Sequence, residues 1–181
     1  GFSVGSNRSE SLNRSLALAR TRLVEDRIAW RWIRIDDLPM YNQDLEPDRL
    51  ETVRRFTAEV ASVPAVLFVT PEHNRSLPAV LKNAIDWGSK PTDKQVWRGR
   101  VAAITGTSFG VIGTALGQQH LRQILGILSM TVMGGEAYIS FKPDPVDHDG
   151  NFLDESKRAF CQAYMDQFVA LVARFADPSV P

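Results

Sequence analysis

The sequence has little of what marks secreted, zinc-binding or membrane-spanning proteins. Its 181 residues include one cysteine, Cys161, and three histidines. An intramolecular disulfide is therefore excluded, and a cysteine-rich zinc site is excluded as well. No apolar run approaches the about 20 residues that a transmembrane helix needs. A single cysteine is typical of a reducing compartment, so we expect a cytoplasmic protein without a membrane partner.

The chain also lacks net charge. Its 21 lysine and arginine residues are balanced by 21 aspartate and glutamate residues. Without an overall positive field we expect no nucleic-acid partner, and any bound anion must be held by a local group of side chains. The 44% of apolar and 23% of charged residues are ordinary for a globular fold, and this length suits one domain over 1–181.

What the sequence does contain is a regular alternation of strand and helix patterns. Short apolar segments are each followed by apolar residues at helical spacing. The expected strands are 2–5, 28–35, 65–69, 101–105 and 130–141, and the expected helices are about 12–23, 48–61, 78–89, 116–128 and 160–175. This alternation favours an α/β fold with a doubly wound parallel sheet of five strands and helices on both faces. The arginines Arg31 and Arg34 indicate that strand 28–35 lies at an edge.

Ligands of such sheets bind at the carboxyl ends of the strands, so the loops after the first, third and fourth strands are the candidate site. The first loop, GSNRSESLN at 5–13, combines hydroxyl groups with Arg8 and a helix start. These groups suit a phosphate, because hydroxyls, a guanidinium and free main-chain N–H groups all donate hydrogen bonds. The alternative is an ordinary helix start with Ser11 as its N-cap.

The third loop lies between Pro71 and Pro78, and two prolines make the intervening main chain stiff. A rigid loop that exposes the main chain of Glu72, His73 and Asn74 can hydrogen-bond the edge of a flat heterocycle. The alternative is a loop stiffened for stability, with solvated side chains.

The fourth loop, TGTSFGVIG at 105–113, contains a literal G-x-S-x-G pattern around Ser108. This pattern raises the hypothesis of a serine hydrolase with Ser108 as nucleophile, His148 as base and Asp144 or Asp147 as the orienting acid. Both acids lie within four residues of His148, and the chain has no HGGG-type oxyanion loop. The pattern is short, so it does not carry the hypothesis alone.

The three loops together resemble one family. GSNRSESLN resembles the GSxRxxSxN motif, and PEHNRSLPAVLKNAIDW resembles the PEYNxSxPxxLKNAIDW motif, of the NAD(P)H-dependent FMN reductases. The segment TSFGVIGTALGQQHLRQIL resembles the fourth-loop segment of the same family, which includes bacterial quinone and chromate reductases. The resemblance extends over nearly the whole chain. It implies a flavodoxin-like sheet with strand order 2-1-3-4-5 and a non-covalently bound FMN.

Carried over position by position, the resemblance also implies the residues that hold the cofactor. The phosphate would be held by Ser6, Arg8, Ser11, Leu12 and Asn13, and the isoalloxazine would be lined by Pro71, Glu72, His73, Asn74, Thr107, Ser108 and Gly110. Arg75 is the candidate for the phosphates of NADH or NADPH, with a solvated surface arginine as the alternative.

Two positions depart from the family pattern. The tyrosine of PEYN is His73 here, and an arginine that often follows the fourth loop is Leu116. In relatives that resemble the quinone and chromate reductases, these positions belong to contacts between paired dimers. We therefore expect a homodimer, with a tetramer as the alternative.

The function implied by the resemblance is an FMN-dependent oxidoreductase. NADH or NADPH would deliver a hydride to FMN, and a small-molecule electron acceptor would then take two electrons in a second step. The acceptors consistent with the family are quinones, free flavins, azo compounds and metal oxyanions such as chromate. No protein side chain is expected to act as a catalytic acid or base. The alternatives are the hydrolase above and a flavin-binding redox sensor without turnover.

Overall fold

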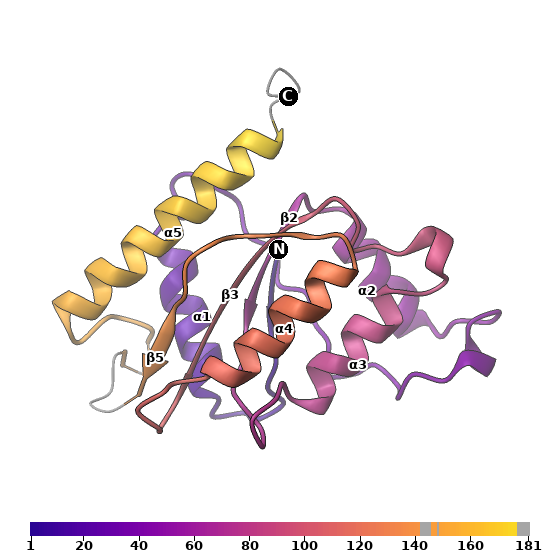
Figure 1. Ribbon diagram of the computed structural model, residues 1–181, viewed down its shortest axis with the longest axis horizontal. Helices are drawn as coiled ribbons and strands as arrows, with labels where there is room; N and C mark the ends of the chain where they lie inside the picture. The colour runs from indigo at the N-terminus through magenta and orange to yellow at the C-terminus, as the bar shows by residue number, and fades with distance from the viewer. Residues whose placement is uncertain (142–145, 148, 177–181) are drawn as a thin grey trace.

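The computed structural model describes residues 1–141, 146–147 and 149–176, and in this part of the chain helices cover both faces of a parallel sheet (Figure 1). The strands are β1 (Phe2–Val4), β2 (Ala65–Val69), β3 (Val101–Ser108), β4 (Thr131–Val132) and β5 (Tyr138–Ser140). The α-helices are α1 (Leu12–Arg22), α2 (Glu51–Ala61), α3 (Ala79–Gly88), α4 (Ala115–Ile127) and α5 (Glu155–Ala176), and two 3-10 helices are η1 (Gln43–Leu45) and η2 (Thr92–Lys94). None of the described helices has the length and apolar character to cross a membrane.

The strand order confirms the predicted topology. β1, β2, β3 and β4 are neighbours in that order, β5 pairs with β3 beyond the end of β4, and all these pairings are parallel. The segment that contains Trp32 lies on the outer side of β1, where Trp32 bridges Phe2 in parallel. Counted by chain segment, the order is the 2-1-3-4-5 of a flavodoxin-like sheet.

The prediction of a full strand at 28–35 was wrong. Only one bridge forms there, with hydrogen bonds from the N–H of Phe2 to the carbonyl of Arg31 and from the N–H of Ile33 to the carbonyl of Phe2. The neighbouring strand β1 has three residues, so the edge segment finds few main-chain partners. The prediction of an edge position was correct, and Arg31 and Arg34 are exposed.

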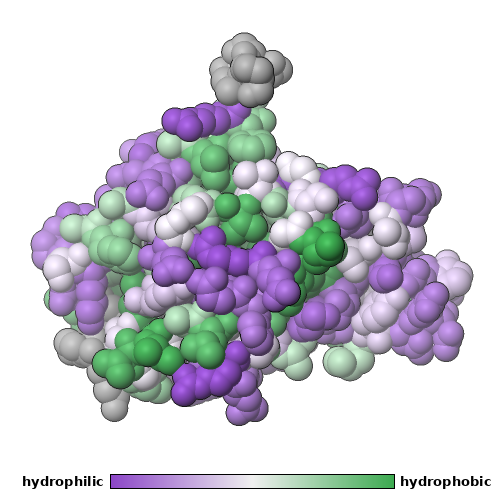
Figure 2. Space-filling view, viewed as in Figure 1, coloured by the Kyte–Doolittle hydropathy of each residue, from purple (hydrophilic) through white to green (hydrophobic). Residues whose placement is uncertain are grey.

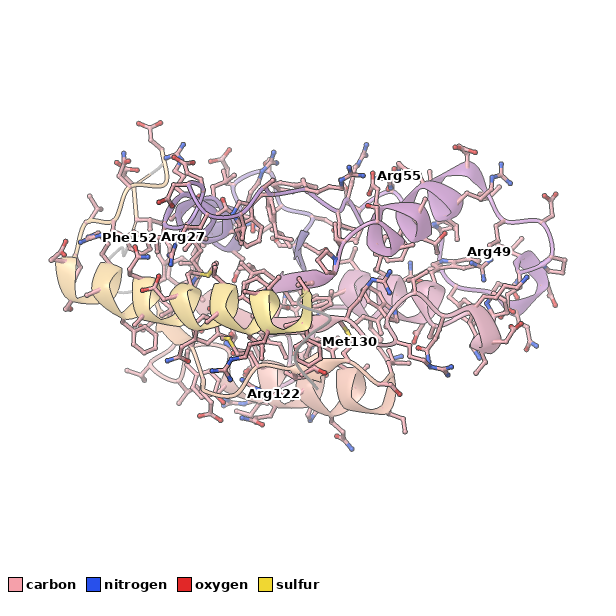
Figure 3. All side chains as sticks on the ribbon, turned by 90° about the horizontal axis from the view of Figure 1, so that it is seen from above. Arg27, Arg49, Arg55, Arg122, Met130 and Phe152 are labelled. Atoms are coloured by element: carbon pink, nitrogen blue, oxygen red, sulfur yellow. The ribbon has the colours of Figure 1, made fainter. Side chains whose placement is uncertain are left out.

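The last predicted strand, 130–141, is divided in two. Gly134 and Gly135 separate β4 from β5, and Gly135 has a φ of 79° that favours glycine. Arg122 on α4 donates hydrogen bonds to the carbonyls of Met133 and Gly135 and so holds this connection against the helix. Figure 3 shows Arg122 between α4 and α5, on the same side of the molecule as Met130.

Alternating side chains of the central strands fill two cores. Ala65, Leu67 and Val69 of β2 face the core shared with α1 and α5, whereas Val66 and Phe68 face the core shared with α2, α3 and α4. A parallel strand covered on both faces needs an apolar residue at every position, which explains the unbroken AVLFV run.

The first residues of three helices can be compared with their predicted starts. Ser11 is the N-cap of α1, as predicted, and its hydroxyl accepts a hydrogen bond from the N–H of Arg14 at 3.3 Å. Pro78 is the N-cap of α3, one residue before the helix, rather than a member of its first turn. α2 begins at Glu51, three residues after the predicted start at 48.

Candidate functional site

The three candidate loops meet at the carboxyl end of the sheet, where β1, β2 and β3 end. A cavity of about 380 Å³ lies between the first and third loops. Its walls are Gly5, Ser6, Asn7 and Arg8 on one side, and His73, Pro78, Ala79 and Val80 on the other. The structure therefore brings the predicted residues Ser6, Arg8 and His73 to one cavity.

Two glycines allow the strand ends to lie this close together. A Cβ atom on Gly5 would lie 2.8 Å from the hydroxyl oxygen of Thr70, and a Cβ on Gly106 would lie 1.9 Å from the carbonyl oxygen of Thr70. Nonbonded contacts of Cβ atoms this short are essentially never found in proteins. The close approach of β1, β2 and β3 at the site thus depends on glycine at these two positions.

The first loop contributes hydrogen-bond donors that the protein itself leaves free. The Arg8 side chain is exposed, and no residue of the described chain pairs with its guanidinium. The Ser6 hydroxyl accepts only a long hydrogen bond, 3.4 Å, from the N–H of Arg8. Ser11 and Leu12 stand at the start of α1, where main-chain N–H groups have no partner within the helix.

The third loop turns sharply at His73–Ser76. The main chains of His73 and Ser76 exchange two hydrogen bonds of 2.9 Å, and Asn74 and Arg75 between them have φ angles of 50° and 67°. Asparagine tolerates this left-handed region, but arginine there costs on the order of 1 kcal/mol. Such strain persists only where the surroundings fix the turn.

Contacts with α4 fix that turn. The Glu72 carboxylate accepts a hydrogen bond from the N–H of Gly117 at 3.0 Å, and its side chain is only 10% exposed. The Ser76 hydroxyl lies 3.0 Å from Nδ1 of His120. The Glu72 side chain therefore points to the start of α4, so the part of this residue available to a ligand is its main chain.

The side chains of Asn13 and Thr107, two of the residues predicted to contact FMN, form hydrogen bonds within the protein. The Asn13 amide donates to the carbonyl of Thr107 at 3.0 Å and accepts from the N–H of Thr107 at 2.9 Å. The Thr107 hydroxyl donates to the carbonyl of Ile139 at 2.8 Å. Both side chains are buried, and buried polar groups must be paired. They join the first and fourth loops to each other and to β5.

The Ser108 side chain also forms its hydrogen bond within the protein. Its hydroxyl donates to the carbonyl of Gly113, so the hydroxyl closes the loop on itself. His148 and Asp144 of the hydrolase hypothesis lie outside the described residues, and the Asp147 carboxylate accepts hydrogen bonds from the N–H and amide of Asn151. Within the described residues, Ser108 has a carbonyl partner and no histidine partner. Gly110 is exposed at the tip of the loop.

Apolar side chains surround the same end of the fourth loop. Val111 is 95% exposed, Phe109 is 58% exposed and Ile112 is 46% exposed. Figure 2 shows apolar surface at the lower left of the molecule, near the start of α4. The neighbouring Tyr138 accepts a hydrogen bond from the Gln119 amide at 2.6 Å, and burial together with its contact to Glu136 raises the pKa of this tyrosine.

Five cavity residues were not among the predicted site residues. Gly5 and Asn7 belong to the first loop, whereas Pro78, Ala79 and Val80 form the start of α3, where the chain leaves the third loop. Pro78 was a sequence signal for the start of this helix. A helix that starts directly after a ligand-binding loop places its first residues next to the same cavity.

The chain resembles known proteins over most of its length. The family model described as NADPH-dependent FMN reductase matches residues 2–144. The chain is 42% identical over 170 residues to a 2-hydroxy-1,4-benzoquinone reductase from a Burkholderia species, with 93% of each chain covered. It is 43% identical over 171 residues to a quinone reductase from Pseudomonas putida, covering 93% of this chain and 91% of the relative.

A solved structure gives the same result in three dimensions. FerB, a flavoenzyme NAD(P)H:(acceptor) oxidoreductase from Paracoccus denitrificans, superposes with a TM-score of 0.92 at 40% sequence identity. The superposition covers 96% of each chain. Sequence and structure therefore place the chain among the same proteins.

Proposed function

The chain belongs to the NADPH-dependent FMN reductase family, and we propose that it reduces small quinones with electrons from NADH or NADPH. Membership confirms the predicted resemblance, the enzyme class and the FMN cofactor. The observation that carries the proposal is the cavity of about 380 Å³ between the first and third loops, at the carboxyl end of the sheet.

The residues at this cavity fit an FMN phosphate. Arg8 has an unpaired guanidinium, Ser6 has a hydroxyl that the protein barely uses, and the N–H groups at the start of α1 point to the same loop. Ser6, Arg8, Ser11 and the main chain of Leu12 would hold the phosphate. Asn13 would act indirectly, by holding the first loop in place through Thr107.

The third loop fits the edge of the isoalloxazine. The main chains of Pro71, Glu72, His73 and Asn74 would line the ring, because the Glu72 side chain is bound to α4 and the turn at 73–76 is rigid. Gly110 would approach the ring from the fourth loop, where Ser108 and Thr107 fix the main chain.

FMN supplies the redox chemistry when it is bound, since it accepts a hydride from the pyridine nucleotide and returns two electrons to an acceptor. The protein binds and orients both substrates and keeps water away from them. The exposed Phe109, Val111 and Ile112 suit a flat, largely apolar acceptor, which favours quinones over a metal oxyanion such as chromate. Arg75, whose only described ion-pair contact is Glu72 at 3.7 Å, would meet the phosphates of NADH or NADPH.

The family resemblance favours a homodimer, with a tetramer as the alternative. The single cysteine favours a cytoplasmic enzyme.

The test is to measure FMN content and NAD(P)H:quinone reduction in the purified protein. We expect bound FMN that is bleached by NADPH without oxygen and regains its absorbance when benzoquinone is added. Arg8→Ala should weaken FMN binding by about tenfold to a hundredfold, since a charge-assisted hydrogen bond to phosphate is lost. Arg31→Ala is the matched control, because Arg31 is exposed and does not line the cavity.

Two results would contradict the proposal. A protein that takes up no FMN even when it is supplied in excess would remove the flavin site from this cavity. Bound FMN that neither NADPH nor NADH bleaches would favour a redox sensor instead of an enzyme.

A further inference from the structure

A second cavity lies on the other face of the first loop. It measures about 400 Å³ and separates the loop at 6–9 from the edge segment at 32–36. The residues Ser6, Asn7 and Arg8 line both this cavity and the FMN cavity, so the two cavities share one wall. The FMN proposal leaves Arg14, Trp32 and Arg34 of the second cavity without a role.

The second cavity carries excess positive charge. Arg8, Arg14 and Arg34 line it together with one carboxylate, that of Asp36. Arg34 donates a hydrogen bond of 2.6 Å to Asp36 and lies 3.8 Å from the Asp37 carboxylate, so the uncompensated charge of the cavity is that of Arg8 and Arg14. Arg8 and Arg14 have no carboxylate partner among the described residues. Because the chain as a whole has no net charge, this concentration of guanidinium groups indicates a locally bound anion.

The same cavity offers a flat surface. The guanidinium of Arg14 lies 4.8 Å from the centre of the Trp32 ring, in cation–π contact. Trp32 also contacts Phe2 in a T-shaped arrangement, with the two ring centres 5.1 Å apart. A planar guanidinium next to an indole is suited to stack on a heterocycle, and Arg14 is an exposed residue of the cavity wall.

We propose that this second cavity binds the adenosine 2′-phosphate end of NADPH. Arg14 and Arg34 hold the 2′-phosphate, and Trp32 with Arg14 forms the surface against which the adenine lies. The inference deepens the proposed function and rests on it, because a dinucleotide that reaches the FMN cavity crosses the shared loop at 6–8 to reach the second cavity. The consequence is selectivity, since NADH lacks the phosphate that these arginines would bind.

The test uses the FMN-loaded enzyme and compares NADPH with NADH. Arg14→Ala should lower kcat/KM for NADPH by about tenfold to a hundredfold and change kcat/KM for NADH by less than about twofold, since only NADPH loses a charge-assisted contact. Arg34→Ala should act in the same direction. Arg31→Ala, on the same edge segment but outside the cavity, should leave both values unchanged.

A binding measurement gives a readout that does not depend on turnover. Calorimetry of the wild-type, FMN-loaded enzyme should show adenosine 2′,5′-bisphosphate binding at least about tenfold more tightly than adenosine 5′-monophosphate, and Arg14→Ala should remove the difference. Equal affinity of the wild type for the two compounds would overturn the inference.

The possible failures are distinguishable. If the wild type oxidises NADPH but Arg14→Ala affects NADH and NADPH equally, this inference is wrong and the proposed function stands. If Arg14→Ala loses its FMN while Arg31→Ala keeps it, the second cavity belongs to the flavin phosphate and the inference is wrong. If the wild type binds FMN but oxidises neither nucleotide, the proposed function itself fails.

Discussion

The two ends of the sheet are closed in different ways. At the amino end, the Arg100 guanidinium donates hydrogen bonds to the carbonyls of Val60, Ala61 and Val63 at 2.8 to 3.0 Å. These carbonyls lie at the end of α2, where a cation is favourable because the helix leaves its last carbonyls unpaired. The Arg100 side chain thus provides hydrogen-bond donors for three main-chain carbonyls at the amino end of the sheet.

The carboxyl end uses its polar side chains to join loops. Asn13 connects the first loop to the fourth, and Glu72 connects the third loop to α4. The loops are held, but the guanidinium groups of Arg8 and Arg14, which line the cavities, have no ion-pair partner among the described residues. At the amino end of the sheet, the guanidinium donors bond to the main chain of the protein. At the carboxyl end, the loops are joined to one another, and the guanidinium donors that line the cavities remain available to a ligand.

The largest effect is expected from Gly106→Ala at the carboxyl end. The new Cβ would meet the carbonyl oxygen of Thr70 at 1.9 Å and the Thr114 hydroxyl at 2.6 Å, so β2 and β3 must separate. We expect a loss of about 3 kcal/mol in the free energy of unfolding and loss of FMN binding, measured by denaturation and by retained flavin.

The matched control is Gly126→Ala. Gly126 lies in the last turn of α4, away from the carboxyl end of the sheet. No atom lies within 4 Å of a Cβ at Gly126, so this change should be neutral or stabilise the helix by up to about 1 kcal/mol. Equal stability of the two variants would mean that the strand ends are not packed as tightly as described.

The next effect is expected from Asn13→Ala. The N–H and carbonyl of Thr107 would be left buried without partners, which costs about 2 kcal/mol in the free energy of unfolding. FMN affinity should fall as well, because the first loop loses its connection to the fourth. Asn42→Ala serves as control, since the Asn42 side chain also accepts a main-chain hydrogen bond but lies at η1, away from the site. Unchanged FMN affinity in Asn13→Ala would show that the connection between the loops is irrelevant to binding.

A smaller effect is expected from Arg100→Ala at the amino end. The three carbonyls are near the surface and can bond to water, so the loss in the free energy of unfolding should be about 1 kcal/mol. FMN affinity and quinone reduction should stay at the wild-type level. Arg98→Ala, an exposed neighbour, is the control for the change in charge. If Arg100→Ala lowers FMN affinity and Arg98→Ala does not, the amino end of the sheet contributes to FMN binding, contrary to this prediction.

The smallest effect concerns pH and the start of α5. Hydrogen bonds from the Ser156 hydroxyl and the N–H of Lys157 hold the pKa of Asp154 below its ordinary value of 3.8. A carboxylate with a lowered folded-state pKa stabilises the fold above its unfolded-state pKa, and this stabilisation disappears as the pH falls through the folded-state pKa.

The thermal midpoint of Asp154→Asn should therefore lie below that of the wild type at neutral pH and approach it as the pH falls below the ordinary carboxylate pKa of 3.8. Asp93→Asn, at an exposed carboxylate of η2, should follow the wild type at every pH. A difference for Asp154→Asn that does not change with pH would rule out the carboxylate as its origin.

Local patterns predicted most of the fold. The strand at 65–69 has the predicted bounds, and α1 begins after the predicted cap, Ser11. The segment at 28–35 failed because its apolar and β-branched residues describe a strand, whereas the number of hydrogen bonds depends on the short neighbour β1. The strand at 130–141 failed as one unit because the Gly134–Gly135 pair ends it.

The structure brings three of the predicted site residues to one cavity. Ser6, Arg8 and His73 do line one cavity, as the position of their loops at the carboxyl ends of the strands required. Asn13 and Thr107 carry the residue types of a ligand contact, yet their side chains bond within the protein. One wall of the second cavity is the first-loop motif, but no motif included Arg14 or Trp32, because these two residues belong to separate segments of the chain.

By itself, the sequence determined the order of strands and helices, the absence of a disulfide and the chemistry available in each loop, because these depend on residue types and near neighbours. Only the tertiary structure decided which donors are used and which remain free. Asn13 and Thr107 are 94 residues apart, and a hydrogen bond over that distance leaves no local pattern. The free guanidinium groups of Arg8 and Arg14 likewise become visible only when the packing of every other polar group is known.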